Sequence, residues 1–79
     1  MELAILSPTE KSTFQILWLE IETVVGGMVI QKGHAPTIVT LKPNSNLSFC
    51  ISKTGKVEVL TAPGGFVEIT RSTVNILLT

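Results

Sequence analysis

The clearest pattern in the chain is an alternation of apolar and polar residues between positions 47 and 52. The apolar positions are Leu47, Phe49 and Ile51, and serines and Cys50 separate them. Since successive side chains of a strand point to opposite faces, this alternation predicts a half-buried β-strand. A polar turn over 53–55 leads to a second alternating stretch, 56–59, whose valines and charged residues fall on opposite faces. The two stretches together predict a β-hairpin.

The stretch from Phe14 to Val25 fits two patterns. As a strand it has two alternating faces, the first with Leu17, Leu19 and Ile21, the second with Ile16, Trp18, Glu20 and Glu22. As a helix it has one apolar stripe at helical spacing, made of Phe14, Leu17, Trp18 and Ile21. The β-branched residues at its end and the following Gly26-Gly27, which we interpret as a turn, favour the strand.

Short apolar or alternating stretches predict the remaining strands, over 3–6, 28–30, 37–41, 66–69 and 74–78. Ser7-Pro8-Thr9-Glu10 predicts a turn, although its Ser-x-x-Glu spacing also fits the start of a helix. No stretch has the length and period of a clear helix. Eight short strands separated by turns predict an all-β sandwich or barrel, and residues 1–79 form a single domain.

Composition and charge argue against some classes of partner. The chain has 44% hydrophobic residues, and six basic and six acidic residues give a formal charge of zero. Because the basic residues form no cluster, we expect no nucleic-acid partner and no electrostatic attraction to a membrane. No apolar run is long enough to span a bilayer, so we expect no direct membrane insertion. A core of this size rarely supplies more than roughly 3–5 kcal/mol, so the free energy of unfolding should be modest.

Reactive side chains are few. Cys50 is the only cysteine and His34 the only histidine, so a nucleophilic dyad of the two, with a third group to orient the imidazole, is the one thiol chemistry available. A lone histidine lacks the three or four ligands of a zinc site. Glu20 and Glu22 share a strand face, where solvation is the usual role. We expect no catalytic site, no metal and no cofactor.

The chain resembles the epsilon subunit of the rotary proton-translocating ATP synthase, called delta in mitochondria. The segments that carry the resemblance are Leu3-Ala4-Ile5-Leu6-Ser7-Pro8 with Phe14, Gly33-His34-Ala35-Pro36, Leu41-Lys42-Pro43, Gly64-Gly65-Phe66-Val67-Glu68-Ile69 and Val74-Asn75-Ile76-Leu77. The resemblance implies an all-β fold, a flattened sandwich of about eight to ten short antiparallel strands. The helical hairpin that ends the typical subunit, and with it the inhibitory function and the ATP site, has no counterpart in these residues.

The same resemblance implies a non-catalytic part of the central stalk that couples the gamma subunit to the ring of membrane c subunits for proton-driven ATP synthesis. The alpha and beta subunits of the catalytic head would be indirect partners, and the location would be peripheral, on the cytoplasmic face of the bacterial inner membrane or its organellar equivalent. Ser7 and His34 match positions that lie toward gamma, and the loop from Gly26 to Pro36, with Gly33 and Ala35, matches the one that faces the ring.

Three places depart from the family pattern, and one is Arg71-Ser72, which replaces the Asn- or Gly-rich last hairpin. Gly27 replaces an acidic residue, and Lys32 replaces a proline. The alternative to the stalk function is a generic β-barrel module that binds a peptide or small ligand. Trp18 supports it, because an aromatic residue beside Glu20 on a mixed face is a possible anchor for a partner.

Overall fold

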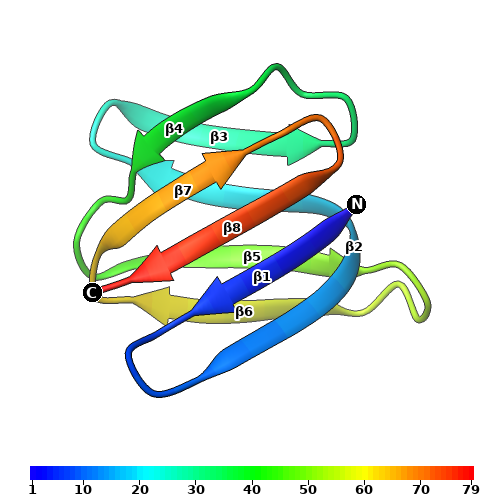
Figure 1. Ribbon diagram of the computed structural model, residues 1–79, viewed down its shortest axis with the longest axis horizontal. Helices are drawn as coiled ribbons and strands as arrows, with labels where there is room; N and C mark the ends of the chain where they lie inside the picture. The colour runs from blue at the N-terminus through cyan, green and yellow to red at the C-terminus, as the bar shows by residue number, and fades with distance from the viewer.

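The protein is a flattened sandwich of strands, and the computed structural model describes all of its residues, 1–79 (Figure 1). The predicted all-β architecture is confirmed. The eight strands are β1 (Glu2–Leu6), β2 (Lys11–Thr23), β3 (Gly26–Gln31), β4 (Thr37–Thr40), β5 (Ser45–Ile51), β6 (Val57–Ala62), β7 (Gly65–Ile69) and β8 (Thr73–Leu78). None of these elements is a helix that could cross a membrane.

Two sheets share the long strand β2. The first sheet has the order β4-β7-β8-β1 and ends on the first half of β2, whereas the second half of β2 pairs with β3 and β5, and β5 pairs with β6. In Figure 1 the strands β7, β8 and β1 lie in front of the layer that contains β5 and β6. One pair departs from the expected antiparallel arrangement, since β1 and β8 run parallel.

A β-bulge in β2 corrects the predicted assignment of its faces. The register against β5 shifts between Ile16 and Trp18, so Leu17 is an extra residue in the strand. An extra residue reverses the alternation of side chains. Ile16 is therefore buried together with Leu19 and Ile21, and Leu17 is 55% exposed, whereas the prediction grouped Leu17 with Leu19 and Ile21 and placed Ile16 on the other face.

The turn after β2 also differs from the prediction. The chain reverses at the exposed residues Val24 and Val25, and Gly26-Gly27 begins β3 instead of forming the turn. Thr23 explains this reversal. Its hydroxyl donates to the carbonyl of Gly26 at 2.7 Å and accepts from the Val25 amide at 3.2 Å, and such local bonds favour a turn over continued pairing.

The core lies between the two sheets. It is a cluster of thirteen buried residues, among which Leu3, Leu19, Ile30, Val67 and Ile76 are fully buried. Each fully buried aliphatic side chain contributes about 1.5–3 kcal/mol by leaving water. The predicted hairpin of β5 and β6 forms, and the valines of β6 and Glu58 do fall on opposite faces. The valines face solvent, however, and Glu58 shares the inner face with Phe49.

Candidate functional site

The loop from Lys32 to Pro36 connects β3 to β4 and is held by backbone hydrogen bonds. Gly33 has φ +88°, a conformation that side chains with a Cβ rarely adopt. Its N–H donates to the carbonyl of Arg71 at 2.8 Å, and the His34 N–H donates to the carbonyl of Gln31 at 3.1 Å. The first bond ties the loop to the β7–β8 connection, so the loop has a fixed position on the sandwich.

The imidazole of His34 is half-buried, and its Nδ1 lies 2.8 Å from the carbonyl oxygen of Ala35. Because a carbonyl oxygen can only accept, Nδ1 is the protonated nitrogen. In the neutral ring Nε2 is then left as an acceptor. The loop therefore holds the histidine ring in one orientation with one nitrogen available to a donor.

The surface beside this loop is apolar and hollowed. Ala35 and Pro36 are exposed, and Ile38 at the edge strand β4 is 69% exposed. Pro36 and Ile38 line a shallow hollow of about 330 Å³ together with residues at the end of β7. The predicted residues Gly33, His34, Ala35 and Pro36 thus form one continuous rim, whose fixed backbone and uncovered apolar groups suit binding to a protein surface.

Ser7, the fifth predicted site residue, lies at the opposite end of the sheet. The parallel pair places Glu2 beside Thr73 at one end and Leu6 beside Leu77 at the other. Gly33 is bonded to the first end through Arg71, whereas Ser7 follows Leu6 at the second. A strand of this length separates the two by roughly 15 Å. The structure therefore does not bring Ser7 and His34 together.

Ser7 closes the turn between β1 and β2. Its Oγ accepts from the Glu10 amide at 3.1 Å, and its own N–H donates to the Glu10 carbonyl at 2.9 Å. Both bonds use backbone atoms of Glu10, so Ser7 stabilises a hairpin turn here. The predicted turn is confirmed, and the alternative of a helix start is wrong.

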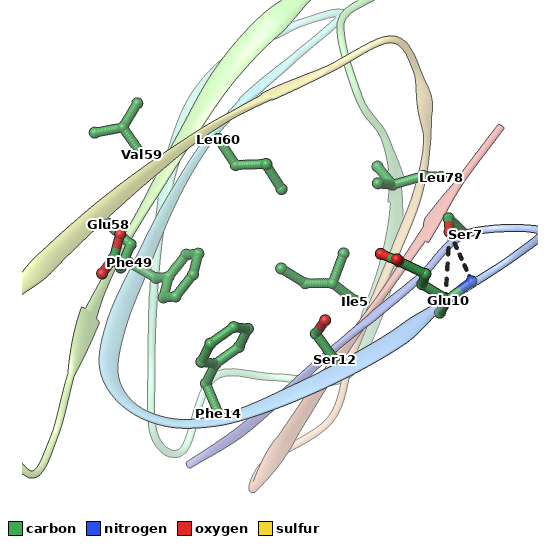
Figure 2. Close-up of a pocket in the computed structure, with 10 residues that line it drawn as sticks. All are labelled: Ile5, Ser7, Glu10, Ser12, Phe14, Phe49, Glu58, Val59, Leu60 and Leu78. Carbon is green, nitrogen blue, oxygen red and sulfur yellow. Dashed lines mark hydrogen bonds between the residues drawn. The ribbon is translucent and has the colours of Figure 1, made fainter.

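A larger cleft, which no pattern in the sequence predicted, lies next to Ser7. Figure 2 shows its apolar side chains facing one another from several strands, with Ser7 and Glu10 at one side. The volume is about 450 Å³, and Ile5, Phe14, Phe49, Leu60 and Leu78 supply most of the wall. The cleft arises because β6 and the first half of β2 are unpaired with each other. This depends on strand order, for which the local pattern holds no signal.

The other reactive side chains that the sequence offered do not come together in one site. Cys50 is 6% exposed and its thiol lies 3.4 Å from the carbonyl of Gly55, while the His34 ring contacts Ala35, so no hydrogen bond joins the two. No cluster of three or more histidine, cysteine or acidic side chains is placed to hold a metal ion. Trp18 is half-buried and lies opposite Cys50 across the β2–β5 pair. The surface therefore provides contact area and hydrogen-bonding groups for binding.

Comparison with known proteins gives one family and a consistent fold. The family model described as "ATP synthase, Delta/Epsilon chain, beta-sandwich domain" matches residues 1–79. The chain is similar to a chain of the Euglena gracilis mitochondrial ATP synthase structure that comprises OSCP, F1 and the c-ring, with a TM-score of 0.87 and 24% identity, covering 96% of this chain and 48% of that one.

A second similar chain belongs to the central stalk and c-ring of the Tetrahymena thermophila mitochondrial ATP synthase. Its TM-score is 0.82 and its identity is 21%, over 100% of this chain and 63% of that one. The protein therefore spans about half to two thirds of the length of these structural relatives.

Proposed function

Because this chain belongs to the family of ATP synthase delta/epsilon chains, whose β-sandwich domain it matches from end to end, we propose that it is a non-catalytic subunit of the central stalk. In this role it couples the gamma subunit to the ring of membrane c subunits, so that rotation driven by protons reaches the catalytic alpha and beta subunits. It is located peripherally, on the cytoplasmic face of the bacterial inner membrane or the equivalent organellar membrane. The observation that carries the proposal is this match over the whole chain.

The mechanism is mechanical. A subunit that transmits torque must keep its shape under load, and two sheets packed on one core with 45 backbone hydrogen bonds meet that requirement. Cys50 and His34 are separate, and the surface offers binding groups in place of a reactive pair. The domain then acts as a rigid spacer between its partners.

The rim at Gly33 to Pro36 is the proposed contact with the partners. His34 presents Nε2 as an acceptor toward gamma, and the loop from Gly26 to Pro36 faces the ring. Ser7 lies at the far end of β1, so a gamma surface that meets both residues must extend along the sheet. Standard interfaces cover roughly 800 Å² on each partner, which is wide enough to reach both ends.

Glu22 compensates for the missing acidic residue at position 27. The register places Glu22 directly opposite Gly27. A Cβ on Gly27 would lie 3.5 Å from one carboxylate oxygen of Glu22 and 3.8 Å from the other. The neighbouring strand thus supplies a carboxylate where the family pattern has one, and Glu22 is the proposed acidic contact with the ring.

Co-purification tests the proposed function. The tagged chain, produced in its own organism, is isolated from detergent-solubilised membranes, and the proteins retained with it are identified by mass spectrometry. The alpha, beta, gamma and c subunits should be recovered with it. A chain recovered without them, or with an unrelated ligand or peptide only, would instead support a generic binding module.

A further inference from the structure

The sandwich is open along one side, between β6 and the first half of β2. β6 pairs with β5 alone, and residues 11–14 of β2 pair with β1 alone. On the other side, a bridge between Thr23 and Leu41 joins β2 to the segment after β4. The apolar cleft of Figure 2 occupies the open side, where Phe14 and Leu60 reach solvent that a closed sandwich would exclude, and the buried ring of Phe49 lines the wall.

Two carboxylates line this apolar cleft, and no basic side chain does. Glu10 and Glu58 lie at opposite sides of the cleft in Figure 2. The only ion pair near them joins Lys56 to Glu58 at 3.4 Å, and both side chains are well exposed, which makes the pair weak. The charge of the cleft is therefore complementary to an occupant that carries a cation beside an apolar group.

The free edge of β6 adds backbone hydrogen-bonding groups to this site. The Ile51 N–H donates to the Lys56 carbonyl, and the Ser52 N–H donates to Gln15 on β2. In an antiparallel strand the backbone N–H and C=O groups of successive residues point alternately to the two neighbouring sides. The register therefore directs the groups of Glu58 and Leu60 toward β5. The N–H and C=O groups of Val57, Val59 and Thr61 face the open side, where a further strand can pair with them.

We propose that the cleft and the free edge of β6 together bind an extended segment of a protein partner, which adds a strand beside β6. In an antiparallel pairing the segment places an apolar side chain opposite Leu60 and, two residues later, a lysine or arginine opposite Glu58. Main-chain bonds to β6 supply affinity, and the two side chains supply specificity. A second copy of this chain is a poor occupant, because it would bring two Glu58 carboxylates to one seam.

This site is distinct from the rim at Gly33 to Pro36, and the inference does not rest on the proposed stalk function. Its probe is the synthetic peptide Thr-Thr-Val-Thr-Leu-Thr-Lys-Thr-Thr, capped at both ends and titrated into the full chain by amide-resolved NMR. Binding should be in the millimolar range or tighter, with shifts concentrated in residues 57–62 and around Phe14 and Phe49. No binding at millimolar peptide, or shifts centred on the Gly33 to Pro36 rim, would overturn the proposal.

Matched controls test its two parts. A peptide with glutamate in place of lysine, and the variant Glu58→Gln, should each weaken binding about three- to fivefold, while Glu20→Gln on the outer face should leave it unchanged. N-methylation of the threonines that flank the leucine should abolish binding, because their N–H groups face β6, whereas N-methylation of the leucine and lysine should not. Equal effects of the two methylation patterns would contradict strand addition, and dimers of the chain that form at β6 would contradict a partner segment as the occupant.

Discussion

The ring centroids of Phe14 and Phe49 lie 4.9 Å apart, and the two ring planes are inclined at 46°. Phe14 belongs to the part of β2 that pairs with β1, and Phe49 belongs to β5 in the other sheet. The contact therefore joins the two layers beside the cleft. This contact depends on the bulge at Leu17. Because of the extra residue, Phe14 and Ile16 before the bulge and Leu19 after it can all point inward.

The bulge predicts opposite sensitivities for two adjacent residues. Ile16 is 1% exposed and Leu17 is 55% exposed. Ile16→Ala should lower the free energy of unfolding by about 2–5 kcal/mol through a cavity in the core, whereas Leu17→Ala should change it by less than about 0.5 kcal/mol. Urea unfolding followed by circular dichroism measures both. The reverse order of sensitivities would restore the uninterrupted alternation that the sequence predicted.

Two adjacent glycines offer a second comparison. Gly65 has φ +137° and a Cβ there would overlap the carbonyl of Leu77, whereas a Cβ on Gly64 would meet only the hydroxyl of Thr79 at 3.4 Å. Gly65→Ala should therefore cost more than about 3 kcal/mol, since backbone strain of about 1–3 kcal/mol adds to the clash. Gly64→Ala should be tolerated. Thermal unfolding of both variants decides the matter, and equal melting temperatures would be inconsistent with this backbone geometry.

The thiol of Cys50 should be inert in the folded protein. It is 6% exposed and lies against the carbonyl of Gly55, and a buried structural thiol is inert because reagents do not reach it. A thiol-reactive chromogenic reagent should label Cys50 only after the addition of denaturant. If the native protein is labelled rapidly and His34→Ala slows this labelling, the result would instead support a dyad of Cys50 and His34.

Local pattern was enough to predict the number and position of the strands. The alternation at Leu47, Phe49 and Ile51 and the turn at Ser7-Pro8 act within a few residues, and the structure has both. The bulge at Leu17 could not be predicted, because it depends on the register against β5. The parallel pairing of β1 with β8 likewise joins segments some seventy residues apart.

The candidate site was predictable to a similar degree. Gly33-His34-Ala35-Pro36 is contiguous in sequence, so its members had to share one loop, and the structure places them on one rim. The distance of Ser7 from that rim, and the position of Glu22 beside Gly27, follow from strand pairing. The cleft between β6 and β2 required the complete topology, since its walls come from distant segments.

The proposed contact of Glu22 with the ring can be tested by comparing Glu22 with Glu20, which lies on the same face of β2. If its carboxylate contacts the ring, Glu22→Gln should weaken binding of the chain to the detergent-purified c ring by about fivefold, as expected for a charged contact at an interface rim. Glu20→Gln, two residues away, should have no effect. Surface plasmon resonance on immobilised ring gives both values. Identical affinities for the two variants would mean that position 27 has lost its acidic contact altogether.

The most direct test of the stalk function is the affinity of this chain for the gamma subunit of its own organism, measured by isothermal titration. The wild-type chain should bind, and His34→Ala should weaken binding at least about fivefold, as truncation of a central contact does, while its unfolding free energy stays within about 0.5 kcal/mol of wild type. A wild-type chain that does not bind gamma, or a His34→Ala variant that binds with equal affinity, would contradict the account.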